Sequence, residues 1–200
     1  TFAGNPYFID LETLIDKKLL TKEECESCDW GGSESYVDYE KMYLSRYKLL
    51  RKAYERADLK NDPDYVAFLK QEEDWLLDYC LFMAIKNAQN GKCWIDWPEE
   101  LKDRHSKAVK EAEKELAEEV GFYSFQQYCF TTQWNKLKEY ANEKGIQIIG
   151  DVPIYVALDS SDAWANPEML QFDEDYNPKA VAGCPPDAFS AIGQLWGNPL

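Results

Sequence analysis

Carboxylate, amide and indole side chains gather in the last quarter of the sequence. Asp151 directly follows a short β-branched run at residues 146–150, and beyond it lie Asp159, Asp162, Trp164, Asp187, Gln194, Trp196 and Asn198. Carboxylates and amides hydrogen-bond sugar hydroxyls, and an indole face covers the apolar face of a pyranose ring. These residue types indicate a binding site for a polyhydroxylated ligand such as a sugar.

A structural role is the alternative for several of these acids. Aspartate and serine are frequent in turns and helix caps. Residues 159–161 (Asp-Ser-Ser) and 173–175 (Asp-Glu-Asp) are typical of such positions. Spacing alone therefore leaves a generic binding loop open beside the sugar site.

The cysteines give little support for metal or nucleophilic chemistry. The six cysteines include one close pair, Cys25 and Cys28, and the single histidine, His105, lies far along the chain. A zinc site needs further ligands beside such a pair, and a cysteine nucleophile needs a partner base. We expect reduced thiols and no metal site.

Helices are expected over most of the first 143 residues. A stripe at three- and four-residue steps shares one helix face and comprises Tyr36, Tyr39, Tyr43, Tyr47, Leu50 and Tyr54. We predict that this stripe packs on a neighbouring helix, with a sugar-stacking platform as the alternative. Asp62 and Pro63 are typical of an N-cap and a first helical residue, and Gly91 is typical of a helix end.

The other segments carry their own expectations. Residues 21–35 predict a loop, residues 99–119 a charged surface helix and residues 122–143 a more apolar helix. Trp94 and Trp97 lie in a predicted loop. Either they fill the core or they stack on a ligand, and the sequence leaves both roles open. Residues 146–150 predict a strand of a parallel α/β fold. Residues 151–200 show little periodicity, and so long a loop inside a compact domain is typical of a functional segment.

Charge and hydropathy exclude several partners. The net charge of −15 comes from 37 acids and 22 bases and repels phosphate backbones, so we expect no nucleic-acid binding. The sequence has no apolar run near the roughly 18 residues that span a bilayer, and no secretory signal at its start. We expect a cytoplasmic protein with no membrane partner. Both ends, Thr1 and Leu200, are typical of cuts within a longer chain.

Several motifs together resemble one carbohydrate-active family. They are GDVPIYVA (150–157), DS (159–160), WANP (164–167), VAGCPPD (181–187), FS (189–190) and GQLWGNPL (193–200). FAGNPYFIDL (2–11), WLLDY (75–79) and FMA (82–84) fit the same pattern. Over essentially its whole length the sequence is similar to the amylomaltases, the 4-α-glucanotransferases (disproportionating enzymes) of glycoside hydrolase family 77.

The resemblance implies a fold and an activity. The implied fold is α/β, part of a (β/α)8 barrel with a large, mainly helical insertion. The implied organisation is a barrel loop segment at 1–20, a helical insertion subdomain at 21–120, and a barrel helix, strand and active-site loops at 121–200. The implied activity is transfer of α-1,4-glucan segments between maltooligosaccharides with retention of configuration, for which no cofactor is needed.

The resemblance also assigns residues. It implies sugar binding by Asp151, Asp187, Gln194, Trp196 and Asn198, and a loop over the active-site cleft at 183–191 that includes Gly183, Pro185, Pro186, Phe189 and Ser190. Ala188 stands where the family commonly carries an aromatic or bulky residue, so no stacking contact is implied there. No catalytic residue is assigned within the chain, because the nucleophile and the acid/base are expected after Leu200. We therefore expect the chain alone to be inactive.

Two other functions remain open from the sequence. The tyrosine and tryptophan surfaces also suit a non-catalytic helical module that binds sugars or another protein. An α-amylase-type hydrolase shares the barrel, although the Pro-Pro-Asp loop followed by QLWGNP points to the transferase. The ratio of transfer to hydrolysis depends on how well the cleft excludes water.

Overall fold

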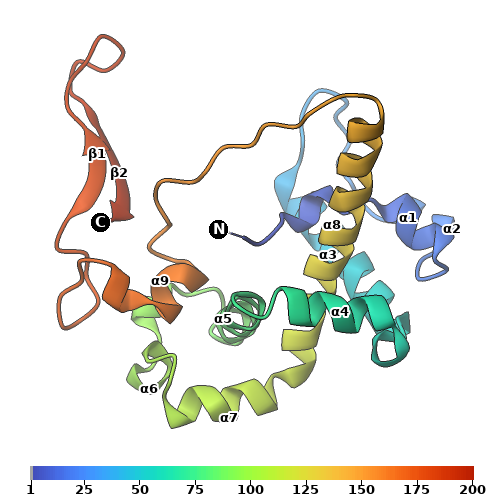
Figure 1. Cartoon of the computed structure of the whole chain (residues 1–200), viewed down its shortest axis with the longest axis horizontal. Coiled ribbons are helices and arrows are strands. Elements are labelled where there is room, and N and C mark those ends of the chain that lie inside the picture. Colours follow the sequence, from blue (N-terminus) through green and yellow to red (C-terminus); the bar gives the residue numbers. More distant parts are fainter. Residues whose placement is uncertain (1) are drawn as a thin grey trace. The chain divides into compact units, whose positions relative to one another are not determined.

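The computed structural model describes residues 2–200 and divides into two compact units. We call Ala3–Asp74 together with Phe122–Ile148 the helical unit. We call Phe2, Trp75–Gly121 and Ile149–Leu200 the hairpin unit. The longest helix, α8 (Ala117–Glu143), begins in the hairpin unit and continues into the helical unit (Figure 1).

Side-chain caps start the helices of the helical unit. Its elements before α8 are η1 (Pro6–Phe8), α1 (Leu11–Asp16), α2 (Lys22–Glu26), α3 (Tyr39–Arg56), η2 (Leu59–Asn61) and α4 (Pro63–Gln71). Asp38 caps α3 by accepting from the amide of Lys41. Asp62 caps α4 by accepting from the amides of Asp64 and Tyr65, and Pro63 is the first helical residue. The start predicted from Asp62 and Pro63 is confirmed.

The core of the helical unit lies between α3 and α8. Leu49, Leu50 and Ala53 of α3 are buried in one cluster with Phe122 and Phe125 of α8. Burial of this face contributes most of the stability of such helices, because helix propensity alone is weak.

The tyrosine stripe is divided between this core and the surface. Tyr47 and Tyr54 lie 6.4 and 5.7 Å from the ring of Phe122, so the predicted helix packing is confirmed for these two. Burial raises the pKa of Tyr47 above its ordinary value. Tyr36 and Tyr39 remain exposed.

A loop is predicted throughout residues 21–35, and this prediction is wrong for the first residues of the segment. Residues 22–26 form α2, whose N-terminus carries a capping box: the Thr21 hydroxyl accepts from the Glu24 amide, and the Glu24 carboxylate accepts from the Thr21 amide. Thr21 and Glu24 have the spacing typical of this motif. The Glu24 carboxylate also pairs with Lys52 and Arg56 of α3, which holds α2 against the longer helix.

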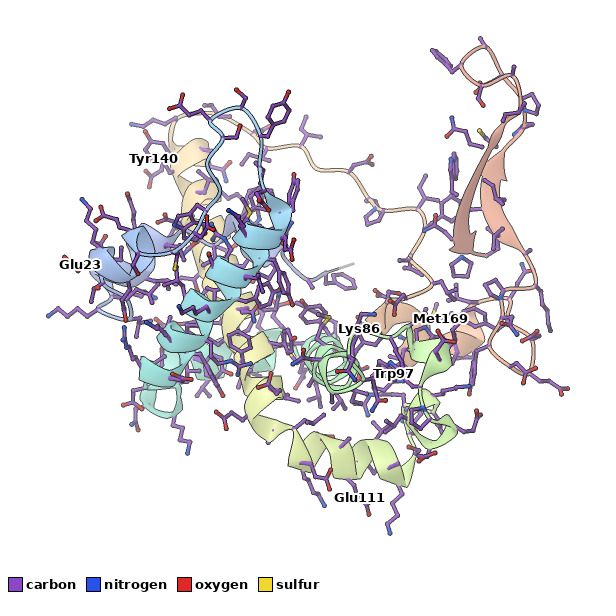
Figure 2. The ribbon with its side chains drawn as sticks, turned by 180° about the vertical axis from the view of Figure 1, so that it is seen from behind. Glu23, Lys86, Trp97, Glu111, Tyr140 and Met169 are labelled. Atoms are coloured by element: carbon purple, nitrogen blue, oxygen red, sulfur yellow. The ribbon has the colours of Figure 1, made fainter. Side chains whose placement is uncertain are left out.

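The hairpin unit combines helices with one small sheet. Its elements are α5 (Leu76–Ala88), η3 (Trp94–Asp96), α6 (Glu99–Lys102), α7 (Lys107–Glu115), α9 (Ser161–Ala165), η4 (Pro167–Met169), β1 (Val181–Cys184) and β2 (Gln194–Pro199). The core clusters Leu81, Phe82 and Ile85 of α5 with Trp94, Trp97, Val109, Ala163 and Trp164. Glu111 projects from α7 on the solvent side (Figure 2), in keeping with the charged surface expected there.

Two predicted helices are each divided in the structure. Trp75 leaves helical backbone geometry, so the helix expected from Asp62 to Gly91 becomes α4 in one unit and α5 in the other. The helix expected at 99–119 ends at Lys102 and restarts at Lys107, because Ser106 caps α7 by accepting from the amide of Val109. Serine at a polar break is an N-cap signal within an otherwise helical pattern.

The predicted strand at residues 146–150 does not form. Within residues 2–200 the sheet has two strands, β1 and β2, and they are antiparallel rather than parallel. Ile146 and Ile149 are 58% and 92% exposed. A parallel strand needs hydrogen-bonded neighbouring strands, and among the described residues this segment pairs with neither β1 nor β2. The described structure is therefore mostly helical.

Residues 151–200 are also more ordered than the sequence suggests. They contain α9, η4 and the β1–β2 hairpin, which Figure 1 shows as a long ribbon closed by a loop at its tip. Val181 pairs with Pro199 and Cys184 with Gln194, with a bulge between Val181 and Gly183. No helix within residues 2–200 has both the length and the apolar character needed to cross a membrane.

Candidate functional site

The segment after Asp151 is attached to β2 by two side chains. The Nδ2 of Asn198 donates to the carbonyl oxygen of Val156 over 2.8 Å. The ring of Trp196 lies 6.0 Å from the ring of Tyr155 at an interplanar angle of 53°. Asp151 precedes this attached segment, is exposed, and accepts from the amide of Val152 at 2.8 Å.

Trp196 presents an exposed aromatic ring whose orientation is held by two contacts. Its Nε1 donates to the Oε1 of Gln194 over 2.9 Å, on the same strand, and its side chain is 49% exposed. This hydrogen bond and the contact with Tyr155 hold the indole in one orientation. A fixed, half-exposed indole beside an amide is suited to stack on a sugar ring while the amide binds a hydroxyl.

The loop between β1 and β2 is built on Asp187. Its Oδ1 accepts from the amides of Phe189 and Ser190 at 2.9 and 2.8 Å, and its own amide donates to the Ser190 carbonyl. The Ser190 hydroxyl donates to the carbonyl oxygen of Gly193 at 2.7 Å. One carboxylate oxygen of Asp187 therefore stabilises the turn by accepting both hydrogen bonds. The turn presents Phe189, which is 96% exposed, at the tip of the hairpin.

Glycine and proline fix the legs of the same loop. A Cβ at Gly183 would lie 2.5 Å from the carbonyl oxygen of Gln194, so the strands approach closely only with glycine there. Pro185 and Pro186 are both exposed and fix the backbone φ angle of the leg that leaves β1.

The residues assigned to sugar binding are therefore only partly brought together. Gln194, Trp196 and Asn198 share β2, and Asp187 lies in the loop that precedes it. No hydrogen bond or ion pair described within residues 2–200 joins Asp151 to Asp187 or Gln194. The contacts made by Tyr155 and Val156 were not predicted. Both lie in the quoted GDVPIYVA motif, but nothing in that motif specifies their partners.

Two aspartates and a serine of the region have structural roles. Asp159 forms an ion pair with Lys86, and Asp173 accepts from the amides of Asp175 and Asn177. The amide of Asn177 contributes most to holding the pKa of Asp173 below its ordinary value. Ser160 caps α9 by accepting from the Ala163 amide. The alternative of turns and caps is confirmed for residues 160 and 173.

The buried tryptophans are core residues rather than ligand-stacking residues. Trp164 and Trp94 are fully buried, and their Nε1 atoms donate to the carbonyls of Leu101 and Leu158 at 3.0 and 2.7 Å. Trp97 and Lys86, labelled in Figure 2, both donate to the carbonyl of Lys92. Trp94, Trp97 and Trp164 are at most 3% exposed, so these three indoles offer no free face to a ligand.

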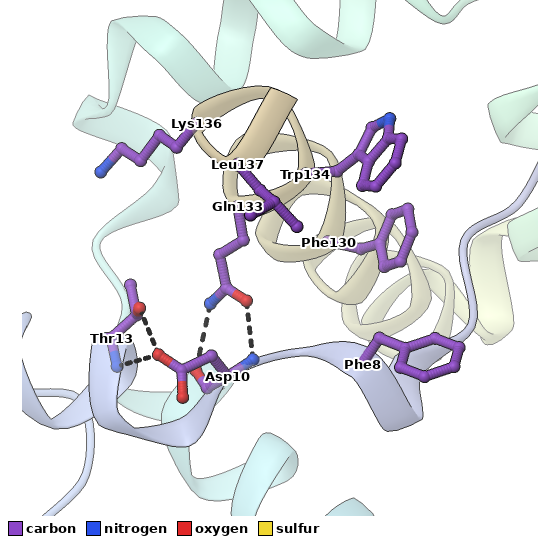
Figure 3. A pocket seen from close by; sticks show the side chains of 8 residues that line it. All are labelled: Phe8, Asp10, Thr13, Phe130, Gln133, Trp134, Lys136 and Leu137. Atoms are coloured by element: carbon purple, nitrogen blue, oxygen red, sulfur yellow. Dashed lines mark hydrogen bonds between the residues drawn. The ribbon is translucent and has the colours of Figure 1, made fainter. Parts of the chain in front are cut away.

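A pocket of about 680 Å³ lies in the helical unit between α8 and the chain around η1. Figure 3 shows the rings of Phe8, Phe130 and Trp134 on one side of it. On the other side Gln133 exchanges two hydrogen bonds with the backbone of Asp10, at 2.7 and 3.1 Å. These polar groups are occupied by one another, so the pocket offers mainly aromatic and aliphatic surface.

Comparison with known proteins identifies the family. Residues 1–200 match the model of glycoside hydrolase family 77, described as 4-alpha-glucanotransferase. The chain is 46% identical over 200 residues to the 4-alpha-glucanotransferase of Clostridium butyricum, covering 100% of this chain and 41% of the relative. It is 45% identical over 203 residues to that of Thermus thermophilus, covering 100% and 40%.

A solved structure agrees with the sequence comparison. The amylomaltase from Streptococcus agalactiae in complex with acarbose matches with a TM-score of 0.91 and 38% identity. The match covers 100% of this chain and 41% of that chain. The chain therefore belongs to the 4-α-glucanotransferase family, and the resemblance inferred from its motifs is confirmed. It spans about two fifths of the length of the relatives it matches.

Proposed function

We propose that this chain supplies part of a 4-α-glucanotransferase that moves α-1,4-glucan segments between maltooligosaccharides with retention of configuration. The observation that carries the proposal is the family match over all 200 residues, together with 46% identity to a 4-alpha-glucanotransferase. The exposed indole of Trp196 and the exposed side-chain amide of Gln194 support it, because an indole face stacks on a sugar ring and an amide hydrogen-bonds a sugar hydroxyl. The net charge of −15 is compatible with such a substrate.

The role proposed for this chain is to bind and orient sugar. Asp151, Asp187, Gln194, Trp196 and Asn198 bind hydroxyls or stack on a ring, and the loop at 183–191 covers the bound glucan. A retaining mechanism uses two carboxylates about 5 Å apart, one as nucleophile and one as acid/base. We assign neither to this chain, so the 200 residues alone do not turn over a substrate.

The barrel is the proposed setting of these residues. Residues 146–150 carry the β-branched composition of a strand and have exposed isoleucines. We propose that they pair as a strand of a (β/α)8 barrel in the family-length protein, and that barrel elements cover the apolar pocket lined by Phe8 and Trp134. The divisions at 1–20, 21–120 and 121–200 belong to the same proposal, as does a cytoplasmic location.

A graft tests the function. The 200 residues replace the matching segment of the Clostridium butyricum relative, and the graft is incubated with maltotriose. We expect glucose and longer maltooligosaccharides to appear together, because transfer conserves the number of glycosidic bonds. Release of reducing ends without longer products would indicate a hydrolase instead. A folded graft that gives neither would contradict the proposal.

A further inference from the structure

Two cysteines lie together at the C-terminal end of α2. Cys25 belongs to the helix and Cys28 follows it by three residues; Glu23 marks this helix in Figure 2. The amide of Cys28 donates to the carbonyl oxygen of Cys25 over 3.4 Å, which closes a turn across residues 25–28. Such a turn brings its first and last Cα atoms within about 7 Å of each other. Disulfides join Cα atoms that are roughly 4.4–6.8 Å apart, so a bond between these two needs little backbone movement.

The turn is attached to its surroundings on both sides. Before it, the Glu24 carboxylate forms its two ion pairs with α3. After it, the Ser45 hydroxyl of α3 donates to the carbonyl oxygen of Asp29 over 2.7 Å. The indole Nε1 of Trp30 donates to the carbonyl oxygen of Cys25 over 2.9 Å. These contacts keep the two thiols close to each other in the folded chain.

Both cysteines are unbridged and partly exposed, so a small reagent in solution reaches them. Burial, and after it the nearby Cys28 thiol, raises the pKa of Cys25 above its ordinary value, which agrees with two sulfur atoms that lie close together. The other four cysteines are either buried or without a neighbouring cysteine in the sequence: Cys80, Cys93, Cys129 and Cys184. Cys25 and Cys28 are therefore suited to react as a pair.

The same pair lacks the remaining ligands of a metal site. A structural zinc ion takes four cysteine, histidine or carboxylate ligands, and a catalytic zinc ion takes three. Among residues 2–200 no group of three or more such side chains is assembled. Thiol–disulfide chemistry needs only the two sulfur atoms and is the reaction that the geometry favours.

We propose that Cys25 and Cys28 form a reversible redox site that exchanges with low-molecular-weight disulfides. One protein thiolate attacks a sulfur of the small disulfide, forms a mixed disulfide and releases one small thiol. The other protein thiolate then attacks the protein sulfur of the mixed disulfide and releases the second small thiol. In total the protein dithiol loses two electrons and two protons, and the small disulfide gains both. The site does not depend on the proposed transferase function.

The effect of closure is local. The Sγ of Cys28 donates to the carbonyl oxygen of Glu24 over 3.4 Å, and the disulfide replaces this hydrogen bond with a covalent bond in the same turn. The ion pairs of Glu24 and the hydrogen bond of Trp30 involve other atoms, so α2 keeps its attachment to α3. The site therefore changes its oxidation state without unfolding of the helical unit.

Incubation with oxidised and reduced glutathione, alkylation of the remaining thiols, trypsin digestion and mass spectrometry test the site. Cleavage after Lys22 and Lys41 gives one peptide, residues 23–41, that carries both thiols and no other cysteine. We expect this peptide to lose about two mass units, one per hydrogen, as the internal disulfide forms. In Cys28→Ser, Cys25 is expected to keep a glutathione adduct instead. Cys184→Ser removes a partly exposed thiol of β1 and, as the matched control, leaves the reaction unchanged.

A second measurement shows what the fold contributes. At a fixed concentration of reduced glutathione, the concentration of oxidised glutathione at half-conversion reports the stability of the internal bond. The closed turn presents the two thiols to each other at a higher effective concentration than a flexible chain does. We therefore expect half-conversion of the native chain at about tenfold less oxidised glutathione than for the same chain in concentrated urea.

Each outcome decides for or against the proposal. A wild-type peptide 23–41 that stays unmodified, or that carries only glutathione adducts, overturns it. Equal half-conversion in the native and the urea-unfolded chain also overturns it, because the turn would then contribute nothing. An internal bond that Cys28→Ser abolishes, that Cys184→Ser retains and that forms more readily in the native chain supports it. The urea comparison uses the wild type, so it remains informative if Cys28→Ser fails to fold.

Discussion

Asn198 holds Val156: the side-chain Nδ2 on β2 donates to the carbonyl oxygen of residue 156 over 2.8 Å. The bond joins the segment that follows Asp151 to the strand that carries Gln194 and Trp196. The residues assigned to sugar binding are distributed over this segment and the hairpin, so this connection positions one part of the candidate site against the other.

The first prediction concerns this connection. Asn198→Ala removes the donor and leaves a partly buried carbonyl without its partner, which we expect to cost about 1 kcal/mol of stability. Hydrogen exchange is expected to accelerate in residues 151–157 and in β2, while α3 remains protected. Asn142→Ala provides the control, since its side chain lies exposed at the end of α8. Equal exchange in the two variants would show that the connection is not needed.

The second prediction concerns the turn that ends the loop at the tip of the hairpin. Gly193 has φ +74°, and a Cβ there would lie 2.6 Å from the carbonyl oxygen of Cys184. Gly193→Ala is expected to lower the free energy of unfolding by about 1–3 kcal/mol, the cost of a strained backbone. Gly32→Ala, with no atom within 4 Å of the added Cβ, should change it by less than about 1 kcal/mol. Urea unfolding measures both, and similar losses would contradict the strain.

The third prediction concerns pH. Hydrogen bonds from Arg56 and then Lys52 hold the pKa of Glu24 far below its ordinary value of 4.5. Because the folded state then binds this proton more weakly than the unfolded state, the stabilisation is complete above about pH 5. It is lost as the pH falls below 4.5 toward the folded pKa.

Thermal unfolding between pH 7 and pH 2 measures this dependence. Glu24→Gln is expected to lower the melting temperature at pH 7 and to flatten its fall in acid. Glu111→Gln, which removes an exposed carboxylate of α7, serves as the control and is expected to retain the wild-type slope. A Glu24→Gln profile parallel to that of the wild type would contradict the role of the ion pairs.

The fourth prediction separates a core indole from an exposed one. Trp164 is fully buried and donates to the carbonyl of Leu101, so Trp164→Phe leaves a small cavity and an unpaired acceptor. We expect a loss of about 1–3 kcal/mol. Trp134→Phe changes a side chain that is 38% exposed and is expected to stay within about 0.5 kcal/mol of the wild type. Denaturant titration measures the free energy of unfolding of both variants. A larger loss for Trp134→Phe than for Trp164→Phe would contradict the assignment of Trp164 to the core.

The sequence specified best those features that depend on neighbouring residues. Asp62 and Pro63 predicted the start of α4 because an N-cap and a first-turn proline act within one turn. The spacing of Tyr47 and Tyr54 predicted helix packing, because both fall on the buried face of α3. The capping box at Thr21 and Glu24 was equally local, and it was missed because the surrounding residues are polar.

Features that depend on residues far apart in the sequence could not be predicted from local patterns. Residues 146–150 have the composition of a strand, but a strand forms only where partner strands supply its hydrogen bonds. The partners of Tyr155 and Val156 lie about 40 residues away on β2, and no local pattern identifies them. The family is nevertheless evident from the sequence, because its motifs occur along the whole chain.

The rate of maltotriose disproportionation by the graft, compared with the unmodified Clostridium butyricum relative, tests the central claim most directly. The account predicts a kcat/KM within about tenfold of the relative, and a further loss of about tenfold or more on Trp196→Ala, roughly 1.4 kcal/mol of transition-state binding. Leu195→Ala, on the same strand and outside the assigned site, should match the graft itself. A folded graft without transfer, or one that Trp196→Ala and Leu195→Ala impair equally, would contradict it.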